Sequence, residues 1–423
     1  MFIICRRQAY SGGRMAKGWS VFAHRFEQYY RSFTPWSVPR LRTREWMLTP
    51  FGGGTPQRHL TFNDRNSIKQ TLVNRTPHSV FYSTAYWRDP SIYKMKEKGW
   101  LGADLIFDLD GDHLPGVMDT DFTTMLEMIR EQAWRLWNDF LEPEFGFEEK
   151  YLQITFSGHR GFHLHYRDPE LVHLDGEARR ELVSHIRGDG VDVISLLPRS
   201  ADHDASGWAL RLRRGLSQTL ERLDDIRNDD SKRSKLLVAT YVDALKRSAR
   251  LRGLKVSRGA KVVDEIARLA SHPIRRGKLE AGNLNTLGGR GANSNFYRDA
   301  FIDILANDSA VVLGSAGETD EVVTIDCHRV IRYPTSLHGK CGLAVTEFPL
   351  SRLDPDGSNP FDPLGEAVAL PMDASMKVEI HAEEINTRLG EVLVEGSAGD
   401  ILELPEAAAA FVVLKGWGEL SSR

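Results

Sequence analysis

The sequence contains few cysteines and no long apolar run. Only Cys5, Cys327 and Cys341 occur among its 423 residues, too few and too widely spaced for a disulfide framework or a four-cysteine zinc site. No stretch approaches the roughly 20 apolar residues that a membrane helix needs. The opening apolar run, MFIIC, is too short for a secretory signal peptide. These absences predict a cytosolic protein that makes no contact with a membrane.

A strong excess of either charge is also lacking. Acidic residues number 58 and lysine plus arginine 55, which gives a formal net charge of −3. This near-balance argues against a globally basic nucleic-acid coat protein. It still allows a local basic groove, because electrostatic attraction depends on where the charges lie. With 41% apolar and 27% charged residues, the composition is that of a globular protein.

The spacing of apolar residues predicts a chain of mixed helices and strands. Helical spacing occurs at 18–33, 121–141 and 174–188, with Thr120 as the expected N-cap of the second helix. Segments rich in β-branched and aromatic residues predict strands around 80–87, 104–110 and 151–166. Strand-like patterning returns at 321–348.

Changes in composition suggest how the chain is divided. Residues 206–295 are charged and helix-rich, which predicts a helical insertion. A segment rich in Pro, Asp and Gly at 353–363 resembles a linker. We therefore expect a disordered N-terminal extension, a core in two parts around the insertion, and a C-terminal linker with a small segment, at 1–17, 18–205, 206–295, 296–350 and 351–423 respectively.

Two aspartates follow the apolar run of DLIFDLDGDH, residues 104–113. On a strand, Asp108 and Asp110 would share one face. Two carboxylates within about 7 Å repel each other unless a cation lies between them or one takes up a proton. Their hard oxygen atoms suit Mg²⁺ or Mn²⁺. These ten residues alone leave three interpretations open: a metal site, the nucleophile of a haloacid-dehalogenase-type phosphatase, or a solvated acidic turn.

A turn between two predicted strands gathers groups that suit phosphate. In SGHRGFHLHY, residues 157–166, the turn offers backbone N–H groups, the Ser157 hydroxyl and the Arg160 guanidinium, a combination typical of anion sites. His163 and His165 alternate with apolar residues, so both imidazoles face one way. An ordinary hairpin with surface histidines would have the same spacing. The basic and hydroxyl groups in one turn favour phosphate binding.

A third polar segment, DEVVTIDCHRVIRYPTSLHGKCGL, spans 320–343. It holds acids and bases together: Asp320, Asp326, Arg332, His338 and Lys340. The His and Lys of SLHGK, two apart beside a glycine, suit phosphate oxygens, with the lysine acting as a point charge. The proline in YPTSL would interrupt a strand ladder, so SLHGK is expected to be a loop between strands.

In this order, the motifs resemble those of the small, catalytic subunit of the archaeal and eukaryotic type of DNA primase, in its archaeal form. The metal motif corresponds to DLD in WLGADLIFDLDGDH, the nucleotide motif to FSGHRGFH, and the third motif to RVIRYPTSLHGKCGL. Weaker matches occur at REW, QRHLTF and VFYSTAYW, which begin at residues 44, 57 and 80. The resemblance extends from about Trp19 to Phe348, with a weaker match in AAFVVLKGWGEL near the C-terminal end.

The resemblance implies a metal-dependent nucleotidyl transfer. Asp108 and Asp110 would hold two divalent ions, Mg²⁺ or Mn²⁺, together with a third carboxylate. Asp320 matches the position of that carboxylate, and Asp326 is the alternative.

The same resemblance implies which residues hold the nucleotides. The incoming triphosphate would bind Ser157, Arg160, His163, His338 and Lys340. Arg332 matches a basic position of the family, and Arg58 matches a basic position near the initiating nucleotide. His159 stands where many relatives carry arginine, which removes one charge from the turn.

The family implies an α/β (α+β) fold: a catalytic core with an RNA-recognition-like sheet, a second αβ unit and a helical insertion. Its activity would be the synthesis of short RNA, or DNA, primers from NTPs or dNTPs on single-stranded DNA, in the cytoplasm of an archaeal cell. The expected partners are the replication machinery and a large subunit that carries an iron–sulfur cluster. Three scattered cysteines could not build that cluster in this chain.

One departure concerns zinc. Many family members carry a zinc knuckle between the acidic motif and the SGxRG turn. The interval from Asp110 to Ser157 contains no cysteine and one histidine, His113. Without thiolates, no structural zinc is expected.

Three other functions compete with a primase. The phosphatase motif needs Thr or Val after the glycine, where this chain has Asp112. A non-enzymatic RNA-recognition module would need stacking aromatic residues rather than a carboxylate pair. A repair or end-joining polymerase on the same core remains an alternative, and it would need a primer or a broken end.

Overall fold

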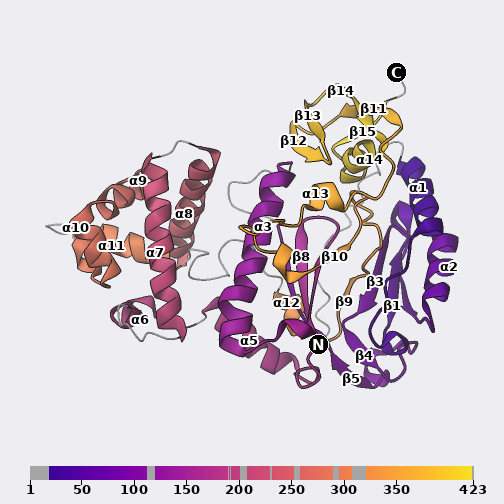
Figure 1. Cartoon of the computed structure of the whole chain (residues 1–423), viewed down its shortest axis with the longest axis horizontal. Helices are drawn as coiled ribbons and strands as arrows, with labels where there is room; N and C mark the ends of the chain where they lie inside the picture. Colours follow the sequence, from indigo (N-terminus) through magenta and orange to yellow (C-terminus); the bar gives the residue numbers. More distant parts are fainter. Residues whose placement is uncertain are drawn as a thin grey trace.

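We describe a computed structural model of the chain over residues 19–111, 120–188, 190, 192–200, 207–228, 231–251, 258–288, 295–306 and 321–421. The predicted N-terminal extension, 1–17, lies outside these residues. Figure 1 shows two sheets side by side, a cluster of helices on one flank and a small α/β unit at one end. The chain therefore has the mixed α/β architecture expected from its sequence.

Two antiparallel sheets form the centre of the molecule. The first sheet has the order β2-β1-β3-β9, with bounds Gln57–Leu60, Trp46–Thr49, Ser79–Ser83 and Val330–Arg332. The second sheet has the order β10-β7-β8-β6, with bounds Thr346–Phe348, Leu152–Phe156, Gly161–Tyr166 and Leu105–Asp110. A short ladder of β4 and β5 lies beside them, at Ala85–Trp87 and Trp100–Ala103. Each sheet joins strands that are far apart in the sequence.

Helices lie against both sheets, and one of them packs against the strands whose alternate side chains are apolar. The helices α1 and α2 pack on each other beside the first sheet, at Trp19–Ser32 and Arg65–Arg75. The apolar face of the second sheet, which includes Phe107, Leu109, Phe162 and Leu164, belongs to the main core. The helix α3 (Phe122–Leu136) packs against β8 and β6 of that sheet.

The start of α3 corrects one prediction. The N-cap is Asp121, whose carboxylate accepts from the backbone N–H of Thr124 at 3.2 Å. Thr120, the predicted N-cap, lies one residue earlier. The carboxylate is the better acceptor at the positive end of a helix. The helix continues through Trp137–Leu141 into α4 (Glu142–Phe145) and ends at Gly146, whose φ is 67°.

The prediction of strands over 321–348 is correct only in part. Residues Glu321–Ile325 form the helix α12, although EVVTI is β-branched. Val323 is buried, and α12 packs against β6 and α5 (Gly176–Arg187). Burial against two neighbouring elements outweighs the weak intrinsic preference of Val and Ile for strands.

The helical part is wider than the predicted insertion, 206–295. Its own hydrophobic core includes Leu197 and Phe301, both almost completely buried. The helices α6 and α11 therefore belong to it, rather than to the two parts of the catalytic core. Among its described residues are the helices α6 to α11, at Val193–Ser200, Gly207–Asn228, Lys232–Leu251, Gly259–Ala270, Pro273–Glu280 and Phe296–Leu305. No helix among the described residues is long and apolar enough to cross a membrane.

The C-terminal segment forms a small unit that shares the main core. It contains a sheet of order β14-β11-β15 and a hairpin of β12 and β13. These strands run at Ile401–Pro405, Ser375–Ile380, Gly418–Leu420, Glu384–Leu389 and Val392–Ser397. The short α13 (Pro363–Glu366) precedes the strands, and α14 (Glu406–Lys415) is almost wholly apolar and buried. Phe411 of α14 packs edge-on against Phe122 of α3, with ring centres 5.4 Å apart.

Candidate active site

The acidic pair lies on the polar face of the second sheet. β6 pairs with β8 so that Asp108 is opposite His163 and Asp110 is opposite Gly161. Directly opposite residues point to the same face of a sheet. Asp108 and Asp110 are partly exposed, whereas Phe107 and Leu109 are buried on the other face. The strand therefore presents both carboxylates on one side, as the sequence predicts.

His163 contacts the first aspartate of the pair. Its Nε2 lies 3.4 Å from Oδ1 of Asp108, and its Nδ1 lies 3.5 Å from Oγ1 of Thr155 on β7. Burial, helped by the charge of Arg332, lowers the pKa of His163 to about 3. The imidazole is neutral at pH 7, so it can offer a hydrogen bond to a ligand but not a positive charge.

The SGHRG turn is closed by its serine. The hydroxyl oxygen of Ser157 accepts from the backbone N–H of Gly161 at 3.1 Å, and the Ser157 N–H donates to the Gly161 carbonyl at 2.8 Å. The turn needs its glycines, because Gly158 has a φ of +82° and a Cβ on Gly161 would lie 2.2 Å from the Leu109 carbonyl oxygen. The serine hydroxyl therefore accepts within the turn while its own proton can point outward. Arg160 follows in the same turn and is partly exposed.

The SLHGK loop packs directly on this turn. The imidazole of His338 stacks on that of His159, with ring centres 4.7 Å apart and a 13° angle between the planes. The thiol of Cys341 donates to the carbonyl of Gly158 at 2.8 Å. Lys340 is exposed at the tip of the loop. The two segments predicted to bind phosphate thus form one continuous surface, although they are far apart in the sequence.

His78 supports the SLHGK loop from the first sheet, and the sequence analysis missed it. A Cβ on Gly339 would lie 2.3 Å from the His78 ring, so this close contact requires glycine at position 339. Burial, with the nearby charges of Arg332 and Lys340, lowers the pKa of His78 to about 4. No motif around His78 indicates this role, because the contact joins two distant segments.

Arg332 lies between the two sheets at the end of β9. It pairs with Phe81 of β3, and its guanidinium carbon lies 4.8 Å from the centre of that ring. Burial lowers the pKa values of His159, His163 and His338, and the charge of Arg332 adds to the effect on all three. Arg332 is therefore close to the acidic pair, the turn and the loop.

Arg58 lies in a different place. It is on β2, at the opposite edge of the first sheet from β9. Its Nε donates to Oε1 of Glu45 at 3.0 Å. Glu45 is fully buried, and its Oε2 also forms an ion pair with Nζ of Lys98 at 3.0 Å. The described contacts thus place Arg58 in an ion cluster around Glu45 rather than beside Asp108.

Of the two candidates for the third carboxylate, only Asp326 lies among the described residues. Asp320 lies outside the described residues. Asp326 is exposed and directly follows α12, beside Cys327, which packs on Ala103. Ala103 ends β5, and Asp108 lies five residues further along the chain, about 16 Å at roughly 3.3 Å per extended residue. Asp326 is therefore at the far end of β6 from the acidic pair.

The donor set suits hard divalent cations. Two carboxylates on one strand face, two residues apart, offer only oxygen ligands, which Mg²⁺ and Mn²⁺ prefer. In the part of the chain that the structure describes, no group of three or more His, Cys, Asp or Glu side chains is gathered as a metal site. His113, the one histidine in the interval where the family resemblance would lead one to look for zinc ligands, lies outside that part, as does the remainder of 112–119.

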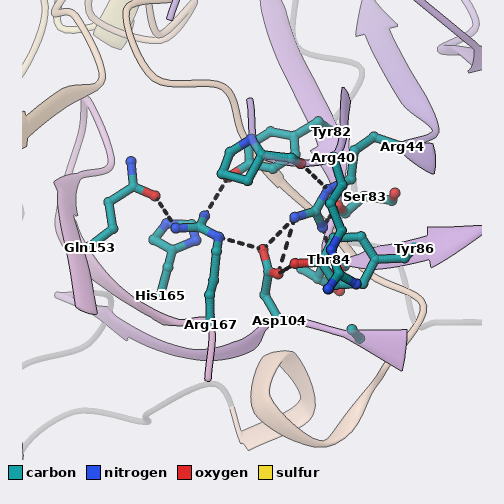
Figure 2. A network of polar contacts seen from close by, with 12 residues as sticks. Arg40, Arg44, Tyr82, Ser83, Thr84, Tyr86, Asp104, Gln153, His165 and Arg167 are labelled. Carbon is teal, nitrogen blue, oxygen red and sulfur yellow. Dashed lines mark hydrogen bonds and ion pairs between the residues drawn. The ribbon is translucent and has the colours of Figure 1, made fainter. Parts of the chain in front are cut away.

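A buried ion network is centred on the residue just before β6, and it was not predicted. Asp104, just before β6, is fully buried and receives both Arg44, at 2.9 and 3.1 Å, and Arg167, at 3.1 Å (Figure 2). Tyr86 also donates to its carboxylate. Burial alone would raise the pKa of Asp104, but Arg44 and Arg167 outweigh burial and hold the pKa below its usual value.

This network links the two sheets. Arg44 precedes β1 and also donates to the carbonyls of Ser83 and Thr84 at 2.8 and 2.7 Å. Arg167 follows β8 and donates to Gln153 of β7 at 2.6 Å. Arg44 and Arg167 therefore connect both sheets to Asp104, the residue that precedes β6. The REW match includes Arg44 and the DLIFDLDGDH motif begins with Asp104, but neither indicated the ion network, and Arg167 had no signal at all.

Comparison with known proteins gives a consistent result. Residues 107–349 match the family model of the DNA primase small subunit. A curated relative, DNA primase small subunit PriS of Methanothrix thermoacetophila, is 32% identical over 94% of this chain and 97% of its own length. The protein of the same name from Halorubrum lacusprofundi is 33% identical over 93% and 95%. That from Methanosphaerula palustris is 32% identical over 94% and 96%. The matched span includes the acidic pair, the SGHRG turn and the SLHGK loop.

Proposed function

Because the chain belongs to the family of DNA primase small subunits, we propose that the polar face of its second sheet is the active site for primer synthesis. As a member of that family it is a nucleotidyltransferase-type enzyme of DNA replication. The observation that carries the proposal is the pairing of β6 with β8, which brings Asp108 beside His163 and the SGHRG turn. The named relatives favour primer synthesis over end joining.

Asp108 and Asp110 would hold divalent cations, with Asp320 as the proposed third ligand. When bound, Mg²⁺ or Mn²⁺ would activate the attacking 3′-hydroxyl and stabilise the leaving pyrophosphate. The protein contributes a fixed strand register, so the two carboxylates keep their spacing before any ligand arrives. This preorganisation reduces the reorganisation needed during the reaction.

The turn and the loop would bind the triphosphate of the incoming nucleotide. Arg160, Arg332 and Lys340 supply positive charge, and a guanidinium can bind two phosphate oxygens at once. His163 and His338 are neutral, so each supplies hydrogen bonding rather than charge. The Ser157 hydroxyl, which accepts inside the turn, can donate its proton to a phosphate oxygen.

The DNA template would bind mainly through its backbone, so its affinity should fall with salt and depend little on sequence. The proposed partner is the large primase subunit with its iron–sulfur cluster. Arg58, held by Glu45, is assigned to the initiating nucleotide only through the family resemblance.

A primer-synthesis assay tests the proposal. The protein is incubated with single-stranded DNA and labelled NTPs or dNTPs, with Mg²⁺, Mn²⁺ or a chelator. We expect labelled primers only when a divalent metal and a template are present, and which nucleotides are used would define the product. Incorporation that needs a pre-existing primer or a broken end would instead support the end-joining polymerase.

A further inference from the structure

One lysine of the C-terminal unit reaches the SGHRG turn. Lys415 is the last residue of α14, and its Nζ lies 2.9 Å from Nε2 of His159. The same Nζ lies 4.0 Å from the ring centre of Phe122 and 4.8 Å from that of Trp417. Lys415 is outside the span that matches the family model, 107–349. It nevertheless contacts the segment assigned to phosphate.

The position of Lys415 is fixed by the packing around it. Phe122 contacts Phe411 edge-on, with ring centres 5.4 Å apart, and contacts Trp417 at 5.8 Å. At the other end of α14, the buried Glu406 forms an ion pair with Arg25 of α1. The C-terminal unit therefore holds the ammonium group in place before a ligand binds, which lowers the entropic cost of using it.

The contact also fixes where the protons of two histidines lie. An ammonium group can only donate a hydrogen bond, so Nε2 of His159 accepts and its proton is on Nδ1. Burial, strengthened by the charge of Lys415, holds the pKa of His159 well below its usual value, and the ring is neutral. The stacked His338 accepts from the Lys340 N–H at Nδ1, at 3.1 Å, so its proton is on Nε2. Each ring has one defined N–H donor.

Lys415 also changes the charge of the turn. His159 itself is neutral. The ammonium of Lys415, in contact with that histidine, adds a positive charge next to the turn. A triphosphate gains more from such a charge than a monophosphate does, because the attraction scales with ligand charge.

We propose that Lys415 is a positioning residue of the nucleotide site, which orients His159 and adds positive charge for the triphosphate. The C-terminal unit is then part of the active site rather than an accessory segment. This inference rests on the proposed function, since it concerns the same site and names the triphosphate as the group that Lys415 serves.

Binding measurements on the full-length protein test the inference without turnover. The variants are Lys415→Met, which removes the charge but keeps an aliphatic chain, and Lys415→Arg, which keeps the charge. The matched control is Lys377→Met, at an exposed lysine of β11 in the same unit. We expect Lys415→Met to weaken ATP binding about tenfold, as for loss of one charged hydrogen bond. AMP binding should change less than about twofold, because AMP lacks the β- and γ-phosphates whose charge Lys415 attracts.

Kinetics and spectroscopy complete the test. In primer extension, Lys415→Met should raise KM for the nucleotide about tenfold and change kcat less than about threefold, with Lys415→Arg close to wild type. Nitrogen-15 spectra of the wild-type protein should show His159 protonated on Nδ1, a result that needs no variant to fold. Equal losses for ATP and AMP, unchanged ATP binding, or a proton on Nε2 of His159 would overturn the inference. A wild-type protein that binds ATP through Lys415 but makes no primers would contradict only the proposed function.

Discussion

Two aspartates, one just before strand β6 and one on it, lie in opposite environments. Asp104, just before the strand, is fully buried and receives two arginines and a tyrosine (Figure 2). Asp108, four residues later, is partly exposed on the polar face beside the neutral His163. The protein supplies the countercharge of the first carboxylate from within its own core. The carboxylate of Asp108 instead faces the side chains that are assigned to the nucleotide and the metal. We therefore expect Asp104 to contribute to stability and Asp108 to activity. Replacing each aspartate by asparagine should separate the two effects.

The largest effect is expected at the exposed site. Asp108→Asn removes a charged oxygen ligand without changing side-chain size, and it should reduce nucleotide incorporation at least about a thousandfold. The midpoint of thermal unfolding should stay the same or rise slightly, because one of two repelling charges is lost. Primer synthesis and thermal unfolding measured on the same sample check both parts. Activity near wild type would contradict the assignment of Asp108 to the metal site.

Replacing the buried Asp104 by asparagine should lower the stability of the fold. Asp104→Asn leaves Arg44 and Arg167 buried without their anion, so the free energy of unfolding should fall by about 3–5 kcal/mol. Urea denaturation measures it, and the exposed Asp326→Asn is a matched control that should change stability by less than about 0.5 kcal/mol. A loss below about 1 kcal/mol at Asp104 would mean that the network does not hold the sheets together.

A third substitution tests whether stability and activity change together at the SGHRG turn, next to the end of β6. Gly161→Ala places a Cβ against the Leu109 carbonyl, so the turn or β6 must shift. We expect a stability loss of about 1–3 kcal/mol together with reduced incorporation, since Asp110 is opposite Gly161. Gly277→Ala in α10 is the control, because nothing lies within 4 Å of its new Cβ. Full activity in Gly161→Ala would show that the turn tolerates displacement.

The last prediction concerns how stability depends on pH. His78 has a pKa of about 4 in the folded protein and about 6.5 when unfolded. Between these values the unfolded chain binds the extra proton, so the free energy of unfolding falls as pH falls from about 6.5 toward 4. His78→Asn should reduce the slope of stability against pH in this range by about one proton. Urea denaturation at several pH values measures the slope, and equal slopes in both proteins would contradict the burial of a neutral His78.

The sequence predicts well those features that depend on local spacing. The alternation in LIFDLD correctly places Asp108 and Asp110 on one side of a strand, because side-chain direction on a strand has a period of two. The strands around the SGHRG turn are also predicted, since β-branched and aromatic residues flank glycines there. In contrast, EVVTI forms α12, because contacts with β6 and α5 decide its structure.

Features that join distant segments escaped prediction. The contact of His78 with Gly339, the ion network of Asp104 and the contact of Lys415 with His159 each join residues far apart in the chain. Nothing in the letters around these residues indicates a partner. The helical part shows the same limit, since α6 and α11 belong to it only through the contacts of Leu197 and Phe301.

The stacking of His159 on His338 also bears on how the protein is made. During synthesis, the acidic pair and the SGHRG turn leave the ribosome well before the SLHGK loop, and α14 follows later still. A nascent chain can therefore form β6, β7 and β8 while half of the phosphate-binding surface does not yet exist. If the turn and the loop bind the triphosphate together, as proposed, a chain that ends before the loop has only one of the two segments that the nucleotide needs.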